Sequence, residues 1–262
     1  MKVVILAGGL GTRLREETDI KPKPMVEIGG HPIIWHIMSH YAESNLKEFV
    51  ICAGYKGEVI KQWFSNFRLL SSDFTVRYGQ ESDITFHDDF PESNWQVTIA
   101  DTGIGTPTGG RIKMIQKFIG NETFLCTYGD GLSDVNIDEI LAFHKSHGKV
   151  ATLTTVRPLT RFGVVEISPE GEVNHFREKP QTDGWINAGF FVFEPQIFDY
   201  LNFDSILEQD PLKELAITGQ LMAFRHDGFW QPMDTFREKQ ELEAIWNSGK
   251  APWKYSQNSK NT

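Results

Sequence analysis

The sequence predicts an α/β fold with a mainly parallel central sheet and helices on both faces. Short apolar runs alternate with amphipathic helical patterns along the first 156 residues, and this alternation is typical of parallel strands joined by helical crossovers. The runs are apolar throughout, which indicates strands buried on both faces of a sheet. These observations favour a Rossmann-like arrangement, completed by a smaller portion of mixed strands.

The first elements show the alternation clearly. Lys2–Ala7 is an apolar run of strand length, and residues 31–45 follow with apolar positions at helical spacing and Pro32 suited to a first helical turn. Residues 48–54 indicate a second buried strand, and residues 57–67 repeat the helical pattern. We therefore expect strand, helix, strand and helix in that order.

The same pattern continues to residue 156. Residues 74–78 and 95–100 resemble strands, with a polar, unpatterned excursion at residues 79–94 between them. The remaining predictions of this part are a helix at 109–119, a strand at 123–128, a helix at 136–148 with Asn136 as its N-cap, and a strand at 150–156.

Beyond residue 156 the strands become shorter, at residues 163–168, 172–176 and 185–193, and a helix is expected at 235–249. No proline- or serine-rich linker separates the two parts. We therefore expect a single domain over residues 1–262, with about 1–156 as its first half, about 157–255 as its second half and 256–262 as a polar tail.

Charge and composition exclude several classes of protein. A net charge of -9 argues against general nucleic-acid binding, which needs a basic surface, and no apolar run reaches the roughly 18 residues of a membrane span. The run Val3–Ala7 is too short for a signal-peptide core. Cys52 and Cys126 are the only cysteines, too few for a disulfide framework. We expect a cytoplasmic protein without nucleic-acid or membrane partners.

The first predicted strand runs into the glycine-rich stretch LAGGLGTRL. At the carboxyl end of a parallel strand, Gly8, Gly9 and Gly11 allow backbone amides to face an anion, and Arg13 adds a guanidinium fork for phosphate oxygens. The alternative is a tight strand-to-helix connection with a surface arginine. The dinucleotide fingerprint fails because Leu14 stands where glycine is needed, and the Walker pattern lacks its Gly-Lys-Ser/Thr ending.

LAGG-x-GTRL at Leu6–Leu14 is followed by KPKP at Lys21–Pro24. Together these motifs resemble those of the nucleoside triphosphate:sugar-1-phosphate nucleotidylyltransferases, and the likeness extends through Asp130 and Glu178–Pro180 to Trp230–Asp234. Within that family, the stretches DTG, TGGRIK, TYGDG, RFG and FWQPMDT are most similar to the branch that transfers CMP from CTP to glucose 1-phosphate.

The resemblance implies an enzyme with CTP and glucose 1-phosphate as substrates, CDP-glucose and pyrophosphate as products, and Mg²⁺ as cofactor. It also implies a place in the biosynthesis of deoxyhexoses for the O-antigen of lipopolysaccharide. The first half would bind the nucleotide and the second half the sugar phosphate. Two alternatives remain open: the same transfer with dTTP or UTP, and a regulator that binds nucleotide sugars without turnover. The polar excursion and several tryptophans favour a homo-oligomer.

The family pattern assigns roles residue by residue. Arg13 would hold the departing pyrophosphate, Lys23 would contact the α-phosphate or the sugar phosphate, and Asp130 would complete the catalytic set. The implied nucleotide-binding residues are Leu6, Ala7, Gly8, Gly9, Leu10, Gly11, Thr12, Arg13, Lys23, Thr106, Gly110, Arg111, Gly129 and Asp130. For Arg111 the alternative is a solvent-facing side chain at a helix N-terminus.

The resemblance also implies that Asp130 and Asp234 bind the metal ion. Mg²⁺ held by substrate phosphates usually takes only one or two protein carboxylates. Taken singly, each aspartate has a simpler explanation, because Asp130 lies between two glycines of a turn and Asp234 directly precedes a predicted helix as a possible N-cap.

The implied sugar-phosphate residues are Gly163, Glu178, Lys179 and Asn187, for which turn-forming roles are the alternative. His36 and His40 are four residues apart on one predicted helix, but a third ligand is not evident, so we expect them to be structural. Trp35, Trp63, Trp95 and Trp185 are expected in the core or at interfaces.

Overall fold

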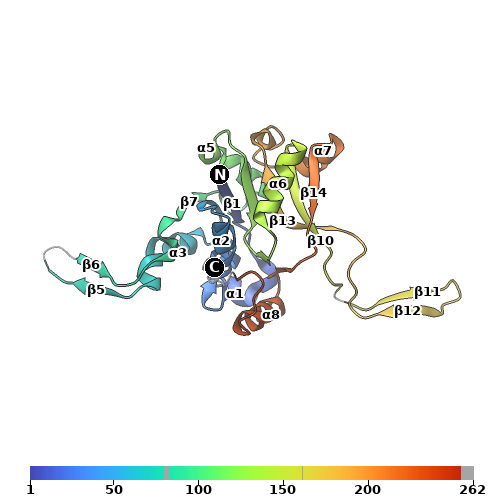
Figure 1. Ribbon diagram of the computed structural model, residues 1–262, viewed down its shortest axis with the longest axis horizontal. Helices are drawn as coiled ribbons and strands as arrows, with labels where there is room; N and C mark the ends of the chain where they lie inside the picture. Colours follow the sequence, from blue (N-terminus) through green and yellow to red (C-terminus); the bar gives the residue numbers. More distant parts are fainter. Residues whose placement is uncertain (80–82, 161, 255–262) are drawn as a thin grey trace, which may run out of the picture.

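A seven-stranded mixed sheet forms the centre of the computed structural model, which describes residues 1–79, 83–160 and 162–254 (Figure 1). The strand order is β14-β10-β13-β8-β1-β4-β7. The strands are β1 (Lys2–Ala7), β4 (Glu48–Ala53), β7 (Gln96–Asp101), β8 (Phe124–Tyr128), β10 (Ala151–Val156), β13 (Ile186–Phe193) and β14 (Leu221–Arg225). Four of the six neighbouring pairs are parallel, and only β13 runs against its neighbours β8 and β10.

Side chains on β1 alternate between two apolar cores, one on each face of the sheet. Val3 and Ile5 belong to the first core, and Val4 and Leu6 to the second. The first core is covered by α2 (Ile33–Glu43), α3 (Gly57–Ser71), α6 (Ile137–His147) and α8 (Phe236–Asn247), and the second by α4 (Thr108–Met114), α5 (Gln116–Ile119) and α7 (Asp210–Ile217). The expected α/β fold with helices on both faces is confirmed.

Most of the expected elements are present, with small differences at their ends. Asn136 caps α6 as expected, since its side chain accepts a hydrogen bond from the Glu139 amide. A single helix was expected over residues 109–119, and this prediction is wrong in one respect. The structure has two helices there, because Ile115 leaves helical geometry and separates α4 from α5. The short remaining helices are η1 (Thr12–Leu14), α1 (Arg15–Thr18), η2 (Lys23–Met25), η3 (Pro91–Asn94) and η4 (Pro195–Asp199).

The excursion at 79–94 was wrongly expected to be unpatterned. It contains β6 (Asp83–Phe86), which pairs with β5 (Phe74–Arg77) in a hairpin that extends away from the body (Figure 1), while residues 80–82 lie outside the described ranges. β6 alternates polar and apolar residues over only four positions, too few to stand out within a polar segment, and it pairs with β5 with Val76 opposite Ile84.

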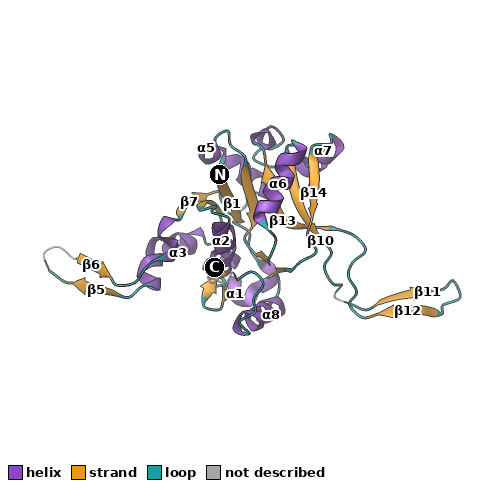
Figure 2. Cartoon of the chain, viewed as in Figure 1, coloured by secondary structure: helices purple, strands orange, loops and turns teal. Residues whose placement is uncertain are grey.

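A second hairpin projects from the opposite side of the body (Figure 2). It pairs β11 (Val164–Ile167) with β12 (Val173–Arg177), at the positions where the sequence predicted short strands. Every residue of β12 is exposed. We call residues 157–185, which include this hairpin and its two connections to the sheet, the second arm. Arg161 of the RFG motif and the polar tail at 256–262 lie outside the described residues.

Two very short antiparallel pairs were not foreseen in the sequence. One joins β2 (Glu27–Ile28) to β3 (His31–Pro32), and the other joins β9 (Gly131–Ser133) to β15 (Trp230–Pro232). Strands of two or three residues are too short to show an alternating hydrophobic pattern in the sequence. The second pair matters for the functional site, because it brings the end of the chain to the end of β8.

His36 and His40 are buried side chains of α2, and each makes a hydrogen bond with a backbone carbonyl oxygen. His36 Nε2 is 2.8 Å from the Ile28 carbonyl oxygen and His40 Nε2 is 2.9 Å from that of Val135. No group of three or more metal-ligating side chains occurs among the residues described. Burial lowers the pKa of His36 from 6.5 to about 4. Within the same ranges, no helix has the length and apolar character needed to cross a bilayer.

Replacing His36 by Gln should weaken the pH dependence of stability. In the unfolded chain His36 takes up a proton below pH 6.5, whereas in the folded protein it does so only near its pKa of about 4. As the pH falls across that window, His36 therefore lowers the free energy of unfolding by on the order of 3 kcal/mol. Gln keeps a donor for the Ile28 carbonyl and does not titrate.

Urea unfolding of the wild type and of His36→Gln at pH 7 and pH 5 measures this effect. The variant should lose less stability between the two pH values. His175→Gln, at an exposed position on β12, is the control and should behave as the wild type. Equal losses in the wild type and His36→Gln would contradict the assignment.

Candidate active site

The sheet changes its order of winding between β1 and β8. The strands β1, β4 and β7 succeed one another toward one edge, and the chain then returns to place β8 on the other side of β1. Ligands of open α/β sheets bind outside the carboxyl ends of the strands at such a switch point. A cavity of about 570 Å³ lies there, lined by residues that follow both strands.

The glycine loop forms one wall of this cavity. Leu6, Ala7, Gly8, Gly9, Gly11, Thr12 and Arg13 line it, whereas Leu10 is half-exposed and lies outside the lining. Gly11 has a φ of 64°, which favours glycine, and a Cβ on Gly9 would point into open space. The loop therefore presents backbone rather than side chains, as an anion site requires.

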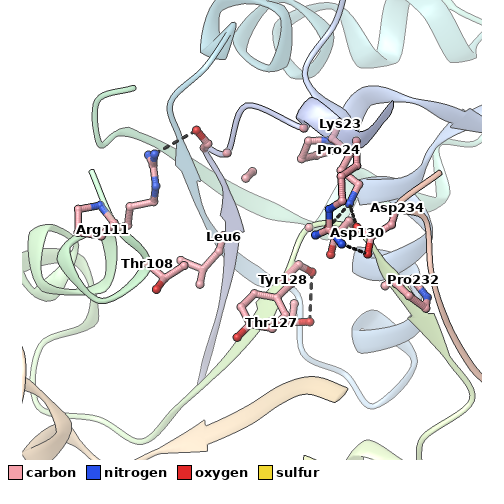
Figure 3. Close-up of a pocket in the computed structure, with 18 of the residues that line it drawn as sticks. Leu6, Lys23, Pro24, Thr108, Arg111, Thr127, Tyr128, Asp130, Pro232 and Asp234 are labelled. Carbon is pink, nitrogen blue, oxygen red and sulfur yellow. Dashed lines mark hydrogen bonds and ion pairs between the residues drawn. The ribbon is translucent and has the colours of Figure 1, made fainter. Parts of the chain in front are cut away.

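Lys23 lies at the centre of a cluster of charges. Its Nζ is 2.5 Å from Asp130 Oδ2 and 2.7 Å from Asp234 Oδ1, and Arg13 Nη1 is 2.7 Å from Asp234 Oδ2. Figure 3 shows the charged ends of Lys23, Asp130 and Asp234 turned toward one another. The two aspartates expected to act as a pair are thus brought to one point, although their roles in binding a metal stay predictions.

The pair β9–β15 explains how residues so far apart in sequence meet. Gly131 is opposite Pro232, and the Met233 amide donates to the Asp130 carbonyl oxygen at 2.8 Å. Asp234 was also considered as a helix cap, but Thr235 is the N-cap of α8 and forms a capping box with Glu238. The Asp234 carboxylate is consequently directed toward Lys23 and Arg13.

This donor set suits a hard divalent cation held together with phosphates. Two carboxylates converge on one position, and the described residues contain no cluster of three or more ligating side chains. Mg²⁺ typically uses one or two carboxylates and takes its other ligands from water and phosphate. Asp130 and Asp234 would hold such an ion, with the remaining ligands supplied by substrate.

Arg111 lines the cavity and does not point to solvent, so the alternative of a surface arginine is wrong, while its expected role in binding the nucleotide stays a prediction. It is 4% exposed, and its five hydrogen bonds go to the carbonyl oxygens of Ala53, Gly103, Gly8 and Ile104 and to the Thr102 hydroxyl, at 2.6 to 3.4 Å. A Cβ on Gly8 would lie 2.0 Å from Arg111 Nη1. Arg111 therefore fixes the glycine loop against the loop that follows β7.

Three of the other four residues expected to bind the nucleotide line the cavity, and Gly110 does not. Thr106 lines the cavity and donates to the Thr102 carbonyl oxygen at 2.5 Å. Gly129 and Asp130 also line it. Gly110 has a packing reason, since a Cβ there would meet the Phe203 carbonyl oxygen at 2.1 Å.

The residues expected to bind the sugar phosphate are not all brought together, although Gly163 and Glu178 are close, since a Cβ on Gly163 would lie 3.1 Å from Glu178 Oε2. Asn187 lines the cavity, because β13 is antiparallel to β8 and begins where β8 ends. Gly163, Glu178 and Lys179 belong to the second arm, outside the cavity lining. Lys179 has a φ of 45°, unusual for lysine. Their roles in binding stay predictions.

Several lining residues were not singled out from the sequence. They are Pro24, Ile104, Pro107, Thr108, Thr127, Tyr128, Gly131, Ala188, Phe190, Trp230 and Pro232. Tyr128 and Trp230 lie in quoted motifs, so their positions next to Asp130 and Asp234 could have identified them. Trp230 donates its indole N–H to the Ala188 carbonyl oxygen at 2.8 Å, which fixes one side of the opening.

Backbone amides, two cations and paired carboxylates at a switch point suit reactants that are both anions. This arrangement defines the class of α/β enzymes that transfer a phosphate-linked group between two such reactants. The chain belongs to the nucleotidyl transferase family, whose model matches residues 2–228. Enzymes of this family act on nucleotide and sugar-phosphate substrates and generally use a divalent metal.

Comparison with known proteins gives similar sequences over almost the full length. The chain is 53% identical to the glucose-1-phosphate cytidylyltransferase of Salmonella typhi, over 97% of this chain and 99% of that protein. It is 41% identical to the probable glucose-1-phosphate cytidylyltransferase of Bacillus subtilis, over 97% and 99% of the two chains.

Solved structures share the fold at low sequence identity. A UDP-glucose pyrophosphorylase aligns with a TM-score of 0.68 at 16% identity, over 95% of this chain and 98% of that one. HddC from Yersinia pseudotuberculosis aligns with a TM-score of 0.66 at 24% identity, over 94% and 99%. These likenesses extend to the fold alone.

Replacing Lys23 by Gln should increase the affinity for a divalent cation in the absence of nucleotide. The variant leaves two adjacent carboxylates without their ammonium counterion, and the uncompensated charge attracts a metal ion more strongly. Titration with Mn²⁺, followed by electron paramagnetic resonance, should give a dissociation constant lower by about 10-fold than that of the wild type.

Lys21→Gln provides the matched control, since Lys21 pairs instead with Glu27 at 3.2 Å. It should leave Mn²⁺ binding unchanged. Weaker Mn²⁺ binding to Lys23→Gln than to the wild type would show that Asp130 and Asp234 do not form the cation site.

Proposed function

We propose that this enzyme transfers CMP from CTP to α-D-glucose 1-phosphate and releases CDP-glucose and pyrophosphate. The observation that carries the proposal is the convergence of Arg13, Lys23, Asp130 and Asp234 beside the glycine loop. The choice of cytosine and glucose is supported by the relatives at 53% and 41% identity, whose names give that activity.

The proposed reaction is an in-line displacement at the α-phosphorus. An oxygen of the sugar 1-phosphate forms the new bond to phosphorus as the bond to the β-phosphate oxygen breaks, and pyrophosphate leaves with that electron pair. The attacking phosphate is already ionised near neutral pH, so no side chain has to remove a proton from it. Catalysis then depends on alignment of two anions and on compensation of their charge.

Each charged group has a part in this scheme. Amides of the glycine loop and Arg13 hold the phosphates that leave, and Lys23 compensates charge at the α-phosphate. Asp130 and Asp234 would hold Mg²⁺, which would supply electrostatic stabilisation and orientation of the phosphate oxygens when bound. Thr106 and the amides near it would contact the base, with Arg111 fixing that segment.

The sugar phosphate would be bound by Asn187 in the cavity and by Gly163, Glu178 and Lys179 from the second arm. For these arm residues to reach a sugar phosphate, the arm must lie against the mouth of a cavity, in its own subunit or in a second copy. A Lys179 ammonium would then add to the positive charge around the two phosphates.

We also propose that the enzyme is a homo-oligomer in the cytoplasm. The second arm exposes apolar side chains, with Phe162 at 79%, Phe176 at 64% and Ile167 at 62%. A two-stranded hairpin without a covering layer is marginally stable in water, and a second copy of the chain would cover it. In the cell, the product would supply deoxyhexoses of the O-antigen of lipopolysaccharide.

An assay with each triphosphate, glucose 1-phosphate and Mg²⁺ tests the proposed reaction. Pyrophosphate should be released with CTP, and release with dTTP or UTP in its place would contradict the choice of base. Binding without release under any triphosphate would favour the alternative of a regulator. Asp130→Asn should lower turnover by about 100-fold or more at unchanged thermal stability. Asp138→Asn, in the first turn of α6, is the control and should keep normal turnover.

Light scattering after gel filtration tests self-association. The wild type should have a mass of two or more times 29.9 kDa. Phe176→Lys places a charge on the exposed apolar side of the second arm and should lower that mass, whereas Glu172→Lys on the same arm should not. A wild-type monomer at micromolar concentration would sink the proposal.

A further inference from the structure

A series of hydrogen bonds runs along one wall of the active-site cavity and ends on Glu208, a residue outside every motif quoted above. Asn187 Nδ2 donates to the Tyr128 hydroxyl at 3.3 Å. The Tyr128 hydroxyl donates to Glu208 Oε1, and the Thr108 hydroxyl donates to Glu208 Oε2 at 2.7 Å. Asn187, Tyr128 and Thr108 line the cavity, so one carboxylate connects three lining residues.

The four residues come from separate elements. Tyr128 ends β8, Asn187 is near the start of β13, and Thr108 begins α4. Glu208 lies in the segment between η4 and α7. Figure 3 shows Thr108 and Tyr128 on the same side of the cavity, next to Leu6.

The hydrogen-bond directions in this series are set by the carboxylate. An ionised carboxylate only accepts, so both hydroxyls must direct their hydrogens toward Glu208. The Tyr128 oxygen is then left as an acceptor for Asn187, and the Thr108 oxygen accepts from the Leu207 amide at 2.9 Å. Burial and the neighbouring Glu208 both raise the pKa of Tyr128, which keeps this hydroxyl protonated.

The orientation of the Asn187 amide follows from these directions. Its Nδ2 faces the Tyr128 hydroxyl, and its Oδ1 accepts from the Gly189 amide at 2.8 Å. The amide carries two N–H donors and the series uses one of them. Among the residues that the structure describes, the second N–H has no hydrogen-bond partner, and Asn187 lines the cavity, so this N–H is available as a donor for a hydroxyl oxygen of a ligand.

Packing leaves the Tyr128 ring little freedom to move. Gly189 has a φ of 83°, and a Cβ at this position would lie 2.3 Å from Tyr128 Cδ2. The ring thus lies directly on the backbone of β13. With the ring fixed in this way, the carboxylate decides only where the hydroxyl hydrogen points.

We propose that Glu208 is a positioning residue for recognition of the hexose, a role that rests on the proposed function. It acts through Tyr128 on Asn187 and so presents an N–H donor at a fixed place to one sugar hydroxyl. Since the same carboxylate binds Thr108 at the start of α4, it also ties the sugar side of the cavity to the segment expected near the base. An epimer whose hydroxyl lies elsewhere loses this hydrogen bond.

A purely structural role is the competing explanation. Glu208 would then anchor residues 202–209 to the body, and its loss would lower thermal stability and affect all substrates equally. A positioning role instead changes the ratio of kcat/KM values between sugars. The two explanations differ in their KM and kcat effects as well, because a lost contact to bound sugar raises KM for the sugar phosphate first.

The experiment compares the wild type, Glu208→Ala, Tyr128→Phe and the double variant, with glucose 1-phosphate and galactose 1-phosphate as acceptors. Glu208→Ala removes the acceptor of the Tyr128 hydroxyl and should raise KM for glucose 1-phosphate by about 10-fold, with kcat changed by less than about threefold. The preference for glucose 1-phosphate should fall by a similar factor. The double variant should be no worse than either single one, since both interrupt the same series.

Glu214→Ala, at an exposed position on α7, is the matched control and should match the wild type. An unchanged KM and sugar preference in Glu208→Ala would overturn the proposal, and so would an equal loss for both sugars together with a lower melting temperature. If the wild type releases no pyrophosphate with any triphosphate, the proposed function fails. In that case calorimetry measures the binding of each of the two sugar phosphates to the same variants. The ratio of the two dissociation constants then tests the inference in place of the ratio of kcat/KM values.

Discussion

The contact of one ammonium group with two carboxylates organises this molecule. Lys23 belongs to the opening segment, Asp130 follows β8 and Asp234 follows β15, so a single cation connects three segments that are 107 and 211 residues apart in the chain. All three side chains are at least two-thirds buried. Two carboxylates this close repel each other strongly when no cation lies between them. Their proximity therefore depends on positive charge, which the Lys23 ammonium supplies in this structure and which a metal ion would supply in the proposed reaction.

The rest of the active site is held in place by hydrogen bonds to the backbone. The short pair β9–β15 sets the distance between the carboxylates, and Arg111 fixes the glycine loop through backbone carbonyl oxygens. Fixed dipoles and charges of this kind stabilise a charged transition state without a cost of reorganisation, which is the main source of catalysis when the reactants themselves supply the bonds that change.

Elements that depend on neighbouring residues were predicted well from the sequence, whereas the pairing of distant segments could not be predicted. The strand at Lys2–Ala7 and the Asn136 cap depend on neighbouring residues, and both are confirmed. The glycine loop and the paired aspartates were found from motifs, and the structure brings the aspartates together. The pair β9–β15 is too short for a periodic signal. No local pattern in the sequence identifies Glu208, because its hydrogen-bond partners come from distant elements. The position of Lys179 could not be predicted either, since no local pattern determines the direction of the second arm.

The close fit of Arg111 against Gly8 also restricts how this sequence can change over generations. Any side chain at position 8 overlaps the guanidinium, and a smaller residue at position 111 leaves several carbonyl oxygens without a donor. Single substitutions at either position are therefore disfavoured, and a successful change needs both at once. The loop and the buried arginine should accordingly be inherited as one unit, even in descendants that have exchanged one base or sugar for another.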